Sequence, residues 1–177
     1  DYLTTTESEE ILEEITLDPE CVLPGTKIET KRGEINIEDT KEDDLIRVYN
    51  FKTKEFGWSS IDAITTATVK GWSELVTEKG YTLKCSNSHL MYNPDYPNSA
   101  IAVDELGEGG ELYVVNKANG KIESDKVVSI ELHDEEVEVW NYELDITHNY
   151  LSNCILSHNR TTKEDIVTDP LTNEVCY

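Results

Sequence analysis

The sequence THNYLSNCILSHNR at residues 147–160 places His148 ten positions before the pair His158-Asn159. The side-chain amide of an Asn can attack its own carbonyl carbon, which closes a five-membered succinimide and releases the next residue as a free amine. An amide is a poor nucleophile and an amine a poor leaving group, so the reaction needs positioned proton donors and acceptors, which imidazoles supply near neutral pH. The stretch therefore predicts cleavage before Arg160, with Asn159 as the nucleophile and the two histidines as its assistants.

Composition limits the class of protein and its partners. The 177 residues suit one domain with two flanks and a buried core. A net charge of −22 argues against nucleic acid and anionic membranes as partners. No secretory signal or apolar run of membrane length is present, and four scattered cysteines do not make a disulfide framework: Cys21, Cys85, Cys154 and Cys176. We therefore expect a monomer in a reducing compartment, cytoplasmic by default.

Most of the chain reads as β-structure. Segments rich in Val, Ile, Thr and aromatic residues predict strands at 45–51, 58–68, 74–77, 81–85, 111–116, 126–132, 136–144 and 149–157. Gly and Pro predict a turn at Pro24-Gly25, a hairpin about Arg32-Gly33, and loops at Pro94, Pro97 and 107–110. A capping-box pattern begins a short amphipathic helix at 7–15 in the acidic flank. The prediction is an all-β domain at 21–159.

Cys21 begins the β region directly after the acidic flank. One interpretation is a small, buried apolar side chain. The other is chemical: the thiol can attack the carbonyl carbon of Glu20 through a five-membered ring, which converts the Glu20–Cys21 peptide bond into a thioester. This intramolecular step gains from effective molarity, but the amide must be twisted or protonated on nitrogen before the thioester is favoured.

The sequence LKCSNSHLMY at residues 83–92 places Ser86 and His89 just after a predicted strand. One of them can hold the carbonyl oxygen of residue 20 while the other protonates the amide nitrogen, or both are ordinary turn residues. A separate pattern is the equal spacing of Cys85 with His89 and of Cys154 with His158. Two thiols and two imidazoles suit a tetrahedral zinc site, although zinc frameworks usually place two cysteines within one knuckle.

The sequences CVLPGTKI at 21–28, LKCSNSHLMY at 83–92 and VWNYELDITHNYLSNCILSHN at 139–159 resemble known motifs in their order and spacing. They are similar to the sequence blocks of the Hint domain, the self-processing module of inteins, bacterial intein-like domains and hedgehog autoprocessing regions. The resemblance covers residues 21–159. It implies a flat, horseshoe-like all-β fold with pseudo-two-fold symmetry, whose two termini meet at a central site.

The resemblance also implies a role for each matching residue. Cys21 would be the upstream nucleophile, and the groups that assist it or Asn159 would be Ser86, His89, His148 and His158. The substrates would be the chain's own flanks at 1–20 and 160–177, with water or an external thiol or amine as acyl acceptor. No cofactor is expected, and zinc at the Cys85, His89, Cys154 and His158 set would inhibit the chemistry without being needed for the fold.

Two positions depart from the family's pattern. Asn141 stands where an Asp is common; it cannot carry a negative charge and is expected to modulate the chemistry, as are Cys85 and Cys154. Arg160 stands where a splicing intein has Cys, Ser or Thr to receive the acyl group. We therefore expect single-turnover cleavage at both junctions, with ligation of the flanks as a minor route. The alternatives are a splicing intein whose downstream nucleophile is absent or substituted, and a non-catalytic acidic β module or zinc-binding structural domain.

Overall fold

The computed structural model describes residues 21–94, 96–144 and 149–158, and within these ranges the chain is almost entirely β-structure. The strands are β1 (Lys27–Thr30), β2 (Gly33–Asn36), β3 (Leu45–Asn50), β4 (Glu55–Thr77), β5 (Thr82–Ser86), β6 (Leu90–Asn93), β7 (Tyr96–Ala102), β8 (Glu111–Asn116), β9 (Lys121–Leu144), β10 (Asn149–Ser152) and β11 (Ile155–His158). One 3-10 turn, η1 (Ile37–Asp39), and one short helix, α2 (Val103–Leu106), interrupt them. In the described part of the chain no helix has the length and apolar character to cross a membrane. The all-β prediction is confirmed, and the helix expected at 7–15 lies outside the described residues.

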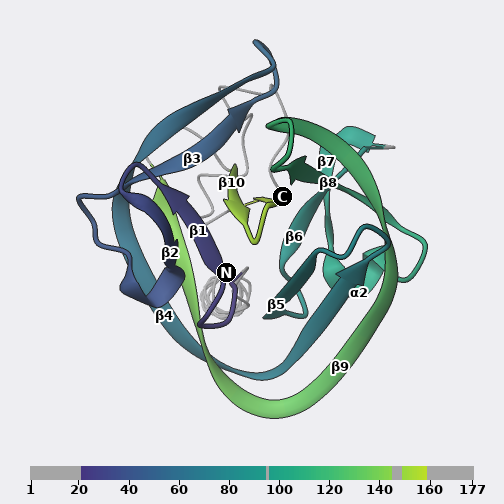
Figure 1. Cartoon of the computed structure of the whole chain (residues 1–177). Coiled ribbons are helices and arrows are strands. Elements are labelled where there is room, and N and C mark those ends of the chain that lie inside the picture. Colours follow the sequence, from purple (N-terminus) through teal and green to yellow (C-terminus); the bar gives the residue numbers. More distant parts are fainter. Residues whose placement is uncertain (1–20, 95, 145–148, 159–177) are drawn as a thin grey trace, which may run out of the picture.

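Two long strands frame the molecule. β4 and β9 run antiparallel from the pair Ile61 and Leu144 to the pair Thr77 and Val127. In Figure 1 they form the outer arc of a horseshoe, with the shorter strands inside it. The register of the pair shifts at three places, and such β-bulges bend a strand. One shift contains Gly71, whose φ of 93° is a conformation that side chains other than glycine rarely adopt.

The sequence predicted each of these long strands as two shorter ones, and that prediction is wrong. β4 continues through residues 69–73 because the Gly71 bulge bends the strand without ending its pairing with β9. β9 continues through residues 133–135 because the residues on both sides of this segment remain paired with β4, and its polar side chains lie largely exposed. The residues between the predicted short strands therefore lie within two continuous strands and are not loops.

The pairing of the strands closes into a ring. The sheet follows the order β10-β1-β3-β4-β9-β8-β11-β6-β7, and β10 also pairs with β11. The single strand predicted at 149–157 is therefore a hairpin, in which Asn149 lies opposite His158 and Ser152 opposite Ile155. Its turn residues, Asn153 and Cys154, have φ of 52° and 65°, as a two-residue turn of type I′ requires.

The two halves of the ring repeat one another. β3 with the start of β4 corresponds to β8 with the start of β9, at a constant displacement along the chain and with the same alternation of buried and exposed residues. Lys54 and Gly120 precede the two long strands with φ of 58° and 70°. Their amides donate to the carbonyls of Asn50 and Asn116, at 2.8 and 2.7 Å. The pseudo-two-fold relation is therefore present down to the turns.

The smaller elements agree with the sequence in part. The turn at Pro24-Gly25 and the hairpin about Arg32-Gly33 are present. A loop was predicted at Pro97, but this residue lies in β7, and the short helix α2 that follows was not predicted. β7 ends the strand order, and an edge strand tolerates Pro97 because one side of its backbone needs no ladder hydrogen bond.

Candidate functional site

Backbone hydrogen bonds fix Cys21 between two strands. The next residue, Val22, forms bridges with Trp140 of β9 and with Cys85 of β5. Val22 N donates to Trp140 O at 3.0 Å, and Trp140 N donates to Val22 O at 2.8 Å. On the β5 side, Ser86 N donates to Cys21 O at 2.9 Å. Val22 thus joins β9 to β5, and these bonds set the position of the Cys21 backbone.

The side chain of Ser86 contacts the peptide bond that was predicted to break. Cys21 N donates to Ser86 Oγ at 3.1 Å, and the Ser86 hydroxyl donates to Cys21 O at 3.3 Å. Cys21 N is the nitrogen of the Glu20–Cys21 bond, so a hydroxyl lies at the atom that must gain a proton when this bond breaks. The sequence left open which atom of this bond Ser86 serves; in the structure its oxygen accepts from the nitrogen and its own proton is directed to Cys21 O, and its role stays a prediction.

The thiol of Cys21 lies in a dry environment. Cys21 is 2% exposed and belongs to a small buried cluster with Leu23, Trp72 and Val139. The Trp72 ring stacks on His133 with centroids 4.0 Å apart and an angle of 7°. Cys21 is thus both buried among apolar side chains and placed against Ser86, so the two interpretations of this residue are compatible. Exclusion of water would protect a thioester at this position from early hydrolysis.

His89 joins the upstream residues to the C-terminal hairpin. Its backbone N donates to Ser86 O at 3.1 Å, which closes the turn after β5. Its ring lies fully buried, with Nε2 2.9 Å from Ser157 Oγ of β11. Sequence analysis missed Ser157, because it looks like one more residue of an alternating strand.

His158 lies beside this arrangement at the end of β11. β11 pairs with β6, so that Ser157 lies opposite Met91 and His158 opposite Leu90, the neighbour of His89. The ring of His158 is fully buried, and its centroid lies 5.3 Å from that of Tyr92. The structure therefore brings Cys21, Ser86, His89 and His158 into one connected region. The other two predicted site residues, His148 and Asn159, lie outside the described residues, and their roles stay predictions.

Asn141 lies close to the same region on β9. It is 6% exposed and stands two residues after Val139 of the Cys21 cluster, on the same face of the strand. Its Oδ1 is buried and has no hydrogen-bond partner among the described residues. A buried amide oxygen without a donor costs free energy.

The zinc set suggested by the Cys and His spacing is not assembled. Among the described residues, no three His, Cys, Asp or Glu side chains come together as metal ligands. Cys154 lies in the turn of the β10–β11 hairpin and His158 at its opposite end, roughly 10 Å or more of strand apart. Burial raises the pKa of the Cys85 thiol, which disfavours the thiolate that a metal needs. Burial also raises the pKa of Cys154, and Lys117 partly offsets this.

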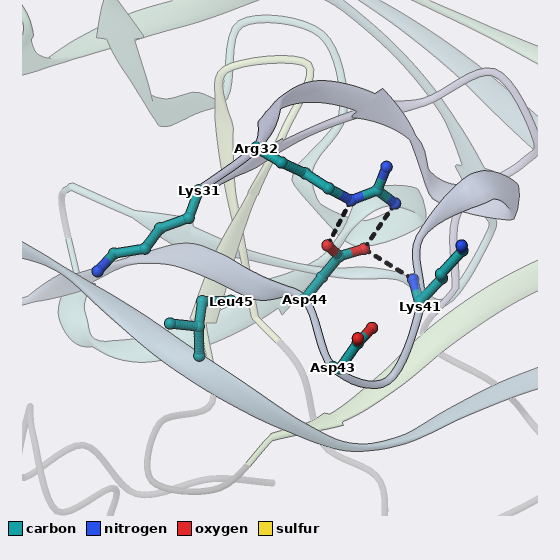
Figure 2. A pocket seen from close by; sticks show the side chains of 6 residues that line it. All are labelled: Lys31, Arg32, Lys41, Asp43, Asp44 and Leu45. Carbon is teal, nitrogen blue, oxygen red and sulfur yellow. Dashed lines mark hydrogen bonds and ion pairs between the residues drawn. The ribbon is translucent and has the colours of Figure 1, made fainter.

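A pocket at the surface lies apart from these residues (Figure 2). It is lined by Lys31, Arg32, Lys41, Asp43, Asp44 and Leu45. Arg32 holds Asp44 with two hydrogen bonds, Nε to Oδ1 at 2.6 Å and Nη2 to Oδ2 at 2.9 Å. These bonds are the largest cause of the lowered pKa of Asp44. None of the predicted site residues lines the pocket, and the ion pair ties the β1–β2 turn to the start of β3.

Solved structures with the same architecture identify the fold. The chain is similar to a bacterial intein-like domain from Clostridium thermocellum, with a TM-score of 0.66 and 23% identity over 78% of this chain and 98% of that one. It is similar to a DnaB intein from Synechocystis sp. PCC 6803, with a TM-score of 0.70 and 22% identity over 79% and 98% of the two chains. The DnaX mini intein from Spirulina platensis gives a TM-score of 0.67, 21% identity and coverages of 78% and 99%. The domain therefore has the Hint fold, the fold of inteins and bacterial intein-like domains.

Sequence comparison adds one relative. No protein-family model matches the chain. The chain is 28% identical over 119 residues to the ribonucleoside-diphosphate reductase subunit beta of Aquifex aeolicus (strain VF5). The match covers 67% of this chain but only 14% of that protein. The two flanks together are much shorter than 119 residues, so most of the match falls within residues 21–159.

Proposed function

We propose that the chain is a single-turnover self-processing domain that cleaves the peptide bonds at its own two junctions. The observation that carries this proposal is the contact of the Ser86 hydroxyl with the amide nitrogen of Cys21, in a fold shared with inteins. In this contact the Cys21 N–H donates to the Ser86 oxygen, so Ser86 lies against the nitrogen that must gain a proton when the bond breaks, and on this proposal its hydroxyl relays a proton there.

At the upstream junction, the Cys21 sulfur attacks the carbonyl carbon of Glu20. A C–S bond forms, the C–N bond breaks, and the thiol proton is transferred to the Cys21 nitrogen, which becomes a free amine. Ser86 and His89 assist this transfer, since Ser86 contacts the nitrogen and His89 closes the same turn. The thioester then passes its acyl group to water or to an external thiol or amine.

At the downstream junction, the side-chain nitrogen of Asn159 attacks its own carbonyl carbon. The succinimide closes as the C–N bond to Arg160 breaks, and the proton lost by the Asn159 amide ends on the Arg160 amine. His158 lies buried directly before Asn159 and His148 is the second proposed assistant. Arg160 has no side-chain nucleophile that accepts an acyl group, so the flanks at 1–20 and 160–177 leave as separate products. The domain acts on its own flanks, as a monomer and without a cofactor.

The alternative function is protein splicing, and one observation favours it. The similar segment of the Aquifex aeolicus reductase subunit is a small part of a much longer protein. If such a segment processes itself and interrupts an enzyme subunit, it has to be excised with ligation of its flanks to restore the subunit. In this chain, splicing would yield a product that joins Glu20 to Arg160.

Intact-mass measurement of the purified chain tests both functions. Incubation with dithiothreitol should release residues 1–20, and Cys21→Ala should abolish that release. Residues 160–177 should be released with or without the thiol, and the domain should carry the water loss of a C-terminal succinimide. Release of residues 1–20 at an unchanged yield from the Cys21→Ala variant would contradict the thioester step. A dominant species that joins the flanks would establish splicing in place of separate cleavage.

A further inference from the structure

Two buried serines form a chain of hydrogen bonds that ends on His89. Ser152 of β10 and Ser157 of β11 are both fully buried. Their Oγ atoms lie 2.5 Å apart, and Ser157 Oγ lies 2.9 Å from His89 Nε2. At the other end, the Ser152 hydroxyl donates to the carbonyl of Ile155 at 3.3 Å. Buried hydroxyls cost free energy unless they are paired, and here each one contacts a neighbour on both sides.

The carbonyl at the end of the chain sets its direction. The contact between the two hydroxyls could run in either direction, but a carbonyl oxygen only accepts; with the Ser152 proton on Ile155 O, Ser152 Oγ is the acceptor for the Ser157 hydroxyl. Ser157 then has no proton left for His89, and its Oγ accepts from Nε2–H. A histidine's tautomer follows from the hydrogen bond that one ring nitrogen makes. This order of donors therefore corresponds to a proton on Nε2.

We propose that Ser157, backed by Ser152, is a positioning residue that holds His89 as the Nε2–H tautomer and leaves Nδ1 as the nitrogen that exchanges a proton in upstream cleavage. This inference rests on the proposed function. The neutral ring accepts the Cys21 thiol proton at Nδ1, and the imidazolium returns it to the leaving nitrogen of the Glu20–Cys21 bond. The Nε2–H bond to Ser157 is kept in both states, so the ring needs no rotation between the two transfers.

The position of the two serines links the hydrogen bonds to His89 with the rest of the domain. Both belong to the hairpin that ends at His158, and Ser152 also lies opposite Ile28 of β1. His89 follows β5 and contributes to a different part of the ring. The hairpin that carries the downstream residues therefore also orients the histidine of the upstream junction.

The test uses the full chain with Ser157→Ala, Ser157→Thr and Ser152→Ala, and Ser59→Ala as the matched control. Ser59 is another buried serine whose hydroxyl donates to a backbone carbonyl, on β4 and outside the site. Upstream release with dithiothreitol should slow about tenfold in Ser157→Ala, recover in Ser157→Thr, and stay unchanged in Ser59→Ala. Downstream release should change little, which separates the effect from general destabilisation.

The tautomer is measured directly by long-range proton–nitrogen NMR of a histidine-labelled Cys21→Ala, Asn159→Ala chain, which cannot process itself. The chain has four histidines, and His89→Gln assigns the signal. We expect Nε2–H in the parent, and a mixture of tautomers in Ser152→Ala and Ser157→Ala.

Nδ1–H in the parent, or an unchanged tautomer together with an unchanged upstream rate in Ser157→Ala, would overturn the inference. If Ser157→Ala does not fold, the tautomer of Ser152→Ala decides. Failure of the proposed function looks different, because the unmodified chain would then release no upstream fragment with the thiol.

Discussion

The two halves of the ring share a scaffold but are followed by different polar residues. β3 with the start of β4 and β8 with the start of β9 have the same length, pairing and burial. β4 is followed by β5, which ends at Ser86, and by the turn that carries His89. β9 is followed by the β10–β11 hairpin, which ends at His158. A repeated framework thus presents one set of polar residues from each half, and on the proposed function the short segments after the long strands decide which junction each half serves.

The largest expected effect is that each of the two histidines, His89 and His158, affects mainly one junction. His89→Ala should slow upstream release about 10²–10⁴-fold, as expected for loss of a general acid–base group, with a much smaller effect downstream. His158→Ala should give the opposite pattern, because it directly precedes Asn159. Time courses of intact mass with and without dithiothreitol measure both rates. Equal slowing of both junctions by either variant would show that the halves do not act separately.

Truncation of equivalent core residues in the two halves should lower the stability of the fold by equal amounts. Ile46 of β3 and Leu112 of β8 occupy the same place in the repeat, and both are fully buried in the main core. Either change to Ala should lower the free energy of unfolding by about 2–5 kcal/mol. Chemical denaturation of a chain with Cys21→Ala and Asn159→Ala avoids processing during the measurement. A loss confined to one of the two positions would show that one half carries the stability of the ring.

Low pH should destabilise the first half of the ring through an ion pair that has no equivalent at the corresponding position of the second half. Arg32 lowers the pKa of Asp44, so the ion pair stabilises the fold above the pKa of this carboxyl in the unfolded chain. That stabilisation is lost as the pH falls through the lower, folded pKa. Asp44→Asn should therefore lower the Tm at pH 7, and the difference from the parent should shrink on acidification. The position that corresponds to Asp44 is Gly110, which has no charge to lose. A difference in Tm that does not vary with pH would contradict this role.

The smallest effect concerns the turns before the two long strands. Lys54 and Gly120 both have positive φ, a conformation that costs Lys more than Gly. Lys54→Gly should raise the free energy of unfolding by about 0.5–1 kcal/mol, since relief of strain exceeds the added entropy of the unfolded chain. Gly120→Lys should lower it by a similar amount. Denaturant midpoints of the two variants measure these changes, and a loss of stability in Lys54→Gly would show that its side chain does more than fit the turn.

The sequence predicted the parts of the fold that depend on local residue order. The strand at 111–116 was predicted with its correct bounds because apolar alternation ends at Gly110 and at Asn116. The continuity of β4 and β9 was missed because it depends on pairing between distant segments across polar bends. The turn at Asn153 and Cys154 was missed because positive φ is unusual for Cys, and here the ring imposes it.

The residues of the site also fall into those that the sequence predicted and those that it did not. Ser86 and His89 followed from motif and chemistry, and in the structure Ser86 contacts Cys21 while His89 closes the turn that begins at Ser86. Ser152 and Ser157 were not predicted, because the sequence of a strand does not show which side chain a serine hydroxyl contacts. That information arises only when β11 lies beside β6 and the ring of His89 faces it.

The closed ring of strand pairings has a consequence for the timing of biosynthesis. Lys27 N donates to the side chain of Asn153 across 126 residues of sequence, and β10 pairs with β1 near the same place. Contacts between segments this far apart form late, because the cost of closing the loop precedes the gain from pairing. During translation, β1 through β9 leave the ribosome before the hairpin that closes the ring exists. On the proposed mechanism, a nascent chain stays intact until its last strands emerge, so the order of synthesis acts as a safeguard against premature release of the upstream flank.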